Sequence, residues 1–146
     1  MRNLLFAAAA TTALLAAASA AQAQTGPTVN ATVQNSTSVT VDFRASSGFT
    51  GTPTPAFPST INAGVTSPTS TTVSPFATST SGFFNYDRQD NLRSCRFGWS
   101  RTRSSLTGPW NAPTTTATPS SSGVTCTATL SNVQANGNFT VSFRIQ

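Results

Sequence analysis

The sequence predicts an all-β protein, a single antiparallel β-sandwich of about seven to nine short strands with one disulfide. Apolar residues recur at every second position in several short stretches, which is the period of half-buried strands. After residues 1–23, no stretch keeps apolar residues about three to four positions apart, as an amphipathic helix requires. Clusters of Gly, Pro, Asn and Ser separate the alternating stretches, and short strands joined by such turns are typical of sandwiches.

Residues 1–23 have the organisation of a cleaved signal peptide. Met1-Arg2-Asn3 is a short cationic start, an Ala-rich apolar segment follows it, and Ala21-Gln22-Ala23 is a small-x-small cleavage site. The predicted domain is then residues 24–146, in a secreted or periplasmic protein. The alternatives are a membrane anchor and a cytosolic helix. The apolar segment is short and Ala-rich for a span, and no later apolar run could cross a bilayer.

The predicted domain begins with two alternating stretches, residues 29–33 and 39–43. Apolar residues alternate there with polar ones, and the Asn-Ser-Thr-Ser sequence at 35–38 has the composition of a turn. We expect the two stretches to pair as an antiparallel hairpin with one face toward water.

Residues 49–80 are rich in Ser, Thr and Pro. Their five prolines exclude helices and long central strands. Short strands are predicted near 59–62 and 70–77, because the segment has phenylalanines and Ile61 to bury. The alternative is a disordered linker.

The stretch 82–100 predicts two strands around a polar turn at 87–91. Alternation places a row of large side chains on one face of each strand. These are Phe84 and Tyr86 in the first strand, and Cys95, Phe97 and Trp99 in the second. We expect Trp99 to lie in the core, close to the disulfide.

The last part of the chain alternates between loops and strands. Residues 101–113 are a predicted loop that carries Trp110, and residues 114–123 are a further Thr/Ser/Pro loop. Strands are predicted at 124–130 and 139–145, and Asn136-Gly137 between them is a strong turn signal.

The two cysteines of the chain, Cys95 and Cys126, predict one disulfide. An even number of cysteines in a small exported domain favours a bridge, and each cysteine falls on an apolar strand face. Closing a loop of about 30 residues would stabilise the fold by roughly 3–4 kcal/mol. The alternative is two free buried thiols.

The composition argues against an enzyme. The chain has no His, Lys or Glu, which excludes a Ser-His-Asp triad, a Cys-His pair and Schiff-base chemistry. Its acids are Asp42, Asp87 and Asp90, of which the last two have the character of turn residues. We therefore predict no catalytic residue, no cofactor and no metal ion; a calcium site at Asp87 and Asp90 is the weak alternative.

The remaining signal is arginine beside aromatic residues. The net charge is +5, and all positive side chains are arginines, which pair with phosphate or carboxylate and stack on rings. The candidate surface-binding residues are Tyr86, Arg88, Arg96, Arg101, Arg103 and Trp110. Such a patch suits anionic lipid or acidic glycan, whereas nucleic acid is a poor partner for an exported protein without a recognition motif. The alternative is a solvated face, with Trp110 closing the end of the sandwich.

Several short motifs, in order, resemble the aegerolysins over residues 29–112. Gly82-Phe83-Phe84-Asn85-Tyr86-Asp87 resembles a glycine-led strand of that family that ends in Tyr-Asp. A strand through Trp99 and the loop Gly108-Pro109-Trp110-Asn111 follow it in the same order. Pro58-Ser59-Thr60-Ile61-Asn62-Ala63-Gly64 resembles the Pro-x-x-Ile-x-x-Gly stretch before that strand, and the early Asn35-Ser36-Thr37 turn also matches.

The resemblance implies a β-sandwich related in shape to the actinoporins that binds particular membrane lipids; some members form pores with a partner protein. It also implies that Tyr86, Trp99, Trp110 and Arg101 lie at the lipid-facing end.

Composition, motifs and resemblance lead to one predicted function. We expect an exported, non-enzymatic binding protein that contacts lipid or a membrane surface through its Arg/aromatic loops. The alternative is an exported structural or adhesive protein that self-associates through the faces or edges of its sheets.

Overall fold

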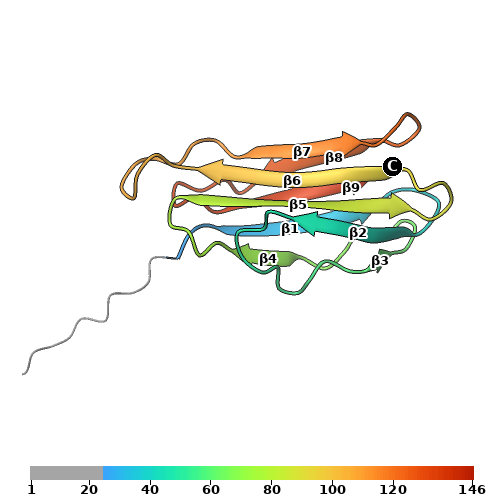
Figure 1. Ribbon diagram of the computed structural model, residues 1–146, viewed down its shortest axis with the longest axis horizontal. Coiled ribbons are helices and arrows are strands. Elements are labelled where there is room, and N and C mark those ends of the chain that lie inside the picture. Colours follow the sequence, from blue (N-terminus) through green and yellow to red (C-terminus); the bar gives the residue numbers. More distant parts are fainter. Residues whose placement is uncertain (1–24) are drawn as a thin grey trace, which may run out of the picture.

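This computed structural model describes residues 25–146, which contain nine strands joined by loops (Figure 1). They are β1 (Thr28–Asn35), β2 (Val41–Ser47), β3 (Thr60–Ile61), β4 (Ser70–Val73), β5 (Ser79–Arg88), β6 (Ser94–Thr102), β7 (Thr114–Pro119), β8 (Cys126–Ser131) and β9 (Phe139–Ile145). The predicted signal peptide lies outside the described residues, so its cleavage stays a prediction. No helix within residues 25–146 has the length and apolar character that a bilayer span requires.

The strands form two sheets that pack face to face (Figure 1). One sheet has four strands in the order β4-β1-β9-β8, and the other has five in the order β3-β2-β5-β6-β7. The named strands pair antiparallel, except that β1 runs parallel to β9. The all-β sandwich with one disulfide confirms the predicted fold class.

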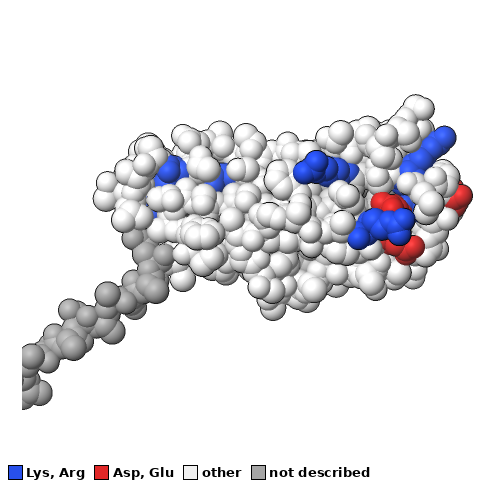
Figure 2. Space-filling view, in the orientation of Figure 1, with Lys and Arg blue, Asp and Glu red and all other residues white. Residues whose placement is uncertain are grey.

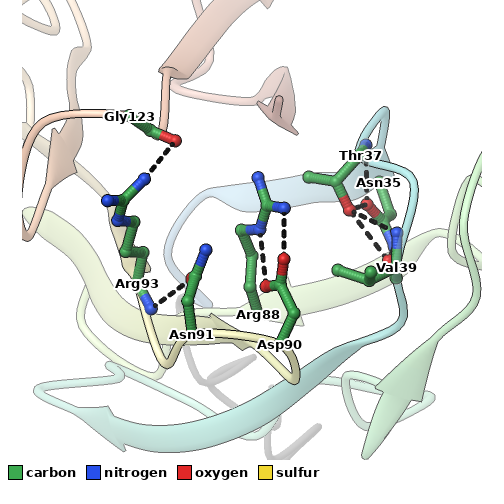
Figure 3. Close-up of polar contacts among 8 residues, drawn as sticks. All are labelled: Asn35, Thr37, Val39, Arg88, Asp90, Asn91, Arg93 and Gly123. Atoms are coloured by element: carbon green, nitrogen blue, oxygen red, sulfur yellow. Dashed lines mark hydrogen bonds and ion pairs between the residues drawn. The ribbon is translucent and has the colours of Figure 1, made fainter.

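The hairpin predicted from the first two stretches is wrong, because β1 and β2 belong to different sheets. Asn35, buried at the end of β1, makes the corner between them (Figure 3). Its amide nitrogen donates to the carbonyls of Val39 and Ile61 at 2.8 and 2.9 Å, and its Oδ1 accepts from the backbone and hydroxyl of Thr37. These bonds turn the chain from one sheet to the other, a change that alternation in the sequence does not encode.

The core is an aromatic cluster centred on Phe84 of β5. Its ring centroid lies 4.3 Å from that of Phe57, 5.7 Å from that of Phe97 and 5.4 Å from that of Phe143. Phe143 belongs to β9 in the opposite sheet, so the cluster connects the two layers. Phe84, Tyr86, Cys95, Phe97 and Trp99 are all buried, as the alternation predicts.

The Pro-rich segment 49–80 is folded, which confirms the preferred prediction over a linker. It contributes the short strands β3 and β4. Phe49 and Phe57 lie on the aromatic cluster; the Phe49 centroid is 5.4 Å from that of Trp99.

The predicted loop 114–123 is partly wrong, because residues Thr114–Pro119 form β7 at the edge of the five-stranded sheet. Threonine stands on both faces of this strand, so no apolar alternation marks it. β-Branched threonine suits a pleated surface, and β7 pairs with β6 from Ser100 to Cys95.

The predicted disulfide between Cys95 and Cys126 is present. It joins β6 to β8 and therefore links the two sheets.

Replacing both cysteines by alanine should lower the free energy of unfolding by about 3–4 kcal/mol, since the loop that the bridge closes becomes free in the unfolded chain. Urea unfolding of the oxidised protein and the double variant measures this difference. A reductant should destabilise only the parent protein; equal stability of the two proteins would contradict the predicted contribution.

Candidate functional site

The predicted single arginine patch is wrong, because the structure distributes these residues along the sandwich. β6 has nine residues, which corresponds to about 30 Å of strand. Arg88, the last residue of β5, lies beside the start of β6, and Arg103 lies just beyond the end of β6. Figure 2 accordingly shows separate patches of positive charge along this face, and the negative charge that is visible gathers at one end. Residues close in sequence are therefore far apart on the surface.

The end with the acids is held by its own polar contacts. Asp87 pairs with Arg44 at 3.1 Å, and Asp42 lies opposite Asp87 on the neighbouring strand. The Arg88 guanidinium donates to both carboxylate oxygens of Asp90 at 3.0 and 2.7 Å (Figure 3). This hydrogen bonding lowers the pKa of the Asp90 carboxyl. The charge of Arg88 is thus already compensated, and the carboxylates proposed for calcium are occupied by arginines.

The opposite end is formed by three connections, residues 74–78, 103–113 and 132–138. A groove of about 580 Å³ lies between the last two of them. It is lined by Arg101, Arg103, Thr107, Gly108, Pro109, Trp110, Ala135 and Asn136. The three aspartates of the chain lie on β2, β5 and the turn after β5, at the other end, so the charged side chains that line this groove are both positive.

Arg101 is buried at the base of the groove, with 5% of its surface exposed. Its Nε donates to the Asn111 carbonyl at 2.9 Å, and its Nη1 donates to the carbonyls of Gln134 and Asn138 at 3.0 and 3.3 Å. Both ion pairs within residues 25–146 lie elsewhere. Burial lowers the pKa of the guanidinium, which stays charged because the pKa of arginine is far above neutral pH. The groove therefore has a positive base without a neighbouring carboxylate.

Arg103 and Trp110 form the wall of the groove. Arg103 Nε donates to the Ala77 carbonyl at 2.8 Å, and its guanidinium carbon lies 4.9 Å from the centre of the Trp110 ring. Trp110 is half-buried against Gly137, whose φ of +100° and lack of a side chain allow this contact. Both readings of Trp110 therefore hold in part: it closes the end of the sandwich and lines an open groove.

Three exposed apolar side chains surround this end, one from each connection. Phe76, Leu106 and Val133 are 56%, 54% and 49% exposed. Sequence reasoning did not select them; the only signal was a large apolar residue inside a polar loop. We call Phe76, Leu106, Val133 and the groove residues Arg101, Arg103 and Trp110 the arginine–tryptophan end. Leu92 and Val65 are also exposed at the acidic end, so the combination of apolar rim and acid-free groove distinguishes the arginine–tryptophan end.

Tyr86 and Trp99 do not belong to this surface. Tyr86 is fully buried, its hydroxyl donates to the Pro58 carbonyl at 2.6 Å, and burial raises its pKa. Trp99 is also buried, with Nε1 donating to Thr80 Oγ1 at 3.4 Å. It lies in the core, as expected, but the expected place close to the disulfide is wrong: Trp99 is four residues, about 13 Å, along β6 from Cys95, and its ring points toward Thr80. Selecting Tyr86 as a surface contact was wrong, because its strand position faces the core. Arg96 is exposed, as expected, but in the middle of the sheet.

No protein-family model matches the chain, and no curated protein matches its sequence. Among solved structures, the chain is similar to the lipid-binding protein Nakanori. The superposition covers 83% of this chain and 71% of Nakanori, with a TM-score of 0.60 and 13% sequence identity. At that identity the likeness to Nakanori shows the fold alone. The comparison therefore supports the resemblance seen in the sequence only at the level of the fold, a β-sandwich that both proteins share.

The buried position of Tyr86 predicts a stability effect. Tyr86→Phe should lower the free energy of unfolding by about 1 kcal/mol, because the Pro58 carbonyl loses its hydrogen bond while the ring stays packed. Urea unfolding measures this change. Unchanged stability would contradict the buried hydrogen bond.

Proposed function

We propose that this protein is an exported, non-enzymatic binding protein whose arginine–tryptophan end docks on the surface of an anionic membrane. One observation supports the proposal above the others: an acid-free groove with two arginines and a tryptophan lies inside a rim of exposed apolar side chains. Each side chain of the rim is about half exposed, so much of its apolar surface is not used in packing the two sheets together. The disulfide is consistent with an oxidising compartment outside the cytosol.

The magnitudes indicate that charge and apolar contact must act together. Each arginine near an anionic surface contributes about 1 kcal/mol, and this term weakens with salt. Burying the exposed half of a large apolar side chain contributes roughly 1 kcal/mol. A half-buried tryptophan adds an amphipathic anchor at the headgroup level. The sum predicts reversible binding that is sensitive to ionic strength.

The likeness to Nakanori supports a lipid partner in general terms. Nakanori is described as a lipid-binding protein and shares the sandwich with this chain. The preference for anionic lipid comes from the charges of the groove instead. The acidic end would face away from the membrane in this orientation, which keeps the aspartates clear of the negative surface.

Co-sedimentation with vesicles tests the proposed function. Residues 24–146 are mixed with phosphatidylcholine vesicles that contain or lack phosphatidylserine, over a series of salt concentrations. We expect binding to the anionic vesicles that decreases with salt. No binding to either vesicle would overturn the proposal.

Two arginines provide a matched test of the docking end. Arg103→Gln should weaken binding to the anionic vesicles about fivefold at low salt, the effect of roughly 1 kcal/mol. Arg93→Gln is the control, because Arg93 is also half-buried, also donates to one backbone carbonyl and lies at the acidic end. Equal losses in the two variants would show that net charge alone determines binding.

Two leucines test the apolar rim in the same way. Leu106→Ser should weaken vesicle binding several-fold at high salt, where the contribution of arginine is screened. Leu92→Ser removes an equally large side chain that is 65% exposed at the acidic end, and it should leave binding unchanged. Weaker binding by Leu92→Ser together with unchanged binding by Leu106→Ser would place the docking surface at the acidic end and contradict the proposal.

The second candidate function is self-association. β4, β8, β3 and β7 are the edges of the two sheets, and none of them has a charged residue. Charges on edge strands commonly prevent pairing between molecules, so the uncharged edges β3, β7 and β8 favour pairing with a second copy. The β4 edge is partly covered, because Thr54 forms a backbone bridge with Thr71. Sedimentation velocity without lipid distinguishes the two functions, because self-association predicts concentration-dependent oligomers and membrane docking predicts a monomer.

A further inference from the structure

A hollow of about 140 Å³ opens on the outer face of the five-stranded sheet. Its polar and aromatic lining comes from Ser46 and Ser47 of β2, Phe83 and Asn85 of β5, and Arg96 of β6. Arg96 precedes Arg101 by five residues on β6, which corresponds to roughly 17 Å. The hollow is therefore separate from the groove at the arginine–tryptophan end.

A β-bulge shapes one side of the hollow. The pairing of β2 with β5 shifts between Phe43 and Ala45, so Arg44 is an extra residue in β2. Bulges bend a strand and re-aim its side chains. Arg44 points to Asp87 and pairs with it at 3.1 Å, while Ser46 and Ser47 beyond the bulge border the hollow. The bulge thus neutralises Asp87 and leaves Arg96 as the charged group of the hollow.

The other side is an aromatic ring and a guanidinium in contact. The Phe83 ring lies against Gly98 on the neighbouring strand, where the Cβ of any other residue would collide with it. The guanidinium carbon of Arg96 lies 4.9 Å from the centre of the Phe83 ring. Arg96 is exposed, and neither ion pair of the described residues includes it. Figure 2 shows an isolated patch of positive charge in the middle of this face, over β6.

We propose that this hollow binds one carboxylated sugar ring. The ring would be a single residue of an acidic saccharide, such as the residue at its end. Arg96 offers paired N–H donors to the carboxylate, and the Phe83 ring offers an apolar surface to the C–H face of the sugar. Asn85, Ser46 and Ser47 offer amide and hydroxyl groups to the sugar hydroxyls. The volume of about 140 Å³ is well below the roughly 300–1,000 Å³ of pockets for larger ligands, which limits the occupant to one ring.

The chemistry favours an acidic sugar over a bare anion. Phosphate would pair with Arg96 and accept from the amide and hydroxyl groups, but it would leave the phenyl ring without a role. A neutral sugar would leave the guanidinium without a partner. Only a ligand with a carboxylate, hydroxyl groups and an apolar ring face matches all the groups that border the hollow.

Calorimetric titration with trigalacturonate tests this site, with fully methyl-esterified trigalacturonate as the uncharged probe. We expect the acid form to bind and the ester to bind about tenfold more weakly or not at all, because a charge-assisted hydrogen bond is lost. Arg96→Gln should cause a similar loss for the acid form, and Phe83→Leu should weaken binding several-fold. Arg93→Gln, with the same change in net charge, should bind as the parent protein does.

Three outcomes would overturn the proposal: equal binding of acid and ester, unchanged binding by Arg96→Gln, or complete competition by equimolar inorganic phosphate. Thermal unfolding of each variant shows whether it is folded, and Arg96→Gln alters an exposed residue, so it provides a decisive test even if the Phe83 variant is unstable. Vesicle binding by Arg96→Gln should match that of the parent protein. Failure of the sugar site and failure of membrane docking are therefore separable.

Discussion

The packing of both sheets onto Phe84 is the constraint on which the rest of this structure depends. One ring on β5 contacts aromatic residues from its own sheet, from β9 of the other sheet and from the Pro-rich segment. Aromatic side chains bury large areas, and their pairs add about 0.5–1.5 kcal/mol each beyond that burial. This cluster allows a chain rich in Ser and Thr, with few large aliphatic residues, to hold a sandwich together. The disulfide reinforces the same layer contact nearby.

The sequence predicts which residues are buried better than it predicts which strands are neighbours. Alternation identified the buried row from Phe84 to Trp99, because a residue's face follows directly from its position in a strand. It could not separate β1 from β2, since the corner at Asn35 depends on hydrogen bonds to a distant carbonyl at Ile61. It also missed β7, where threonine occupies both faces.

The candidate site was predictable in part, for a similar reason. Arg101, Arg103 and Trp110 were selected from composition, and the structure brings these three together. Arg88 and Arg96 were selected with them because they are close in sequence, yet an extended strand separates residues by about 3.3 Å each. The rim residues Phe76, Leu106 and Val133 come from three separate connections, and only the topology of the sandwich gathers them at one end.

β6 explains why one chain segment contributes to both proposed surfaces. Its inward row consists of Cys95, Phe97, Trp99 and Arg101, so Arg101 occupies the position where the next core residue would lie. A buried cation is costly there unless hydrogen bonds compensate it, and three loop carbonyls do so. The same bonds fix connections 103–113 and 132–138 against each other. The base of the groove is thus a continuation of the core row and is held by these hydrogen bonds, whereas the outward row of β6 presents Arg96 to the hollow on the sheet face.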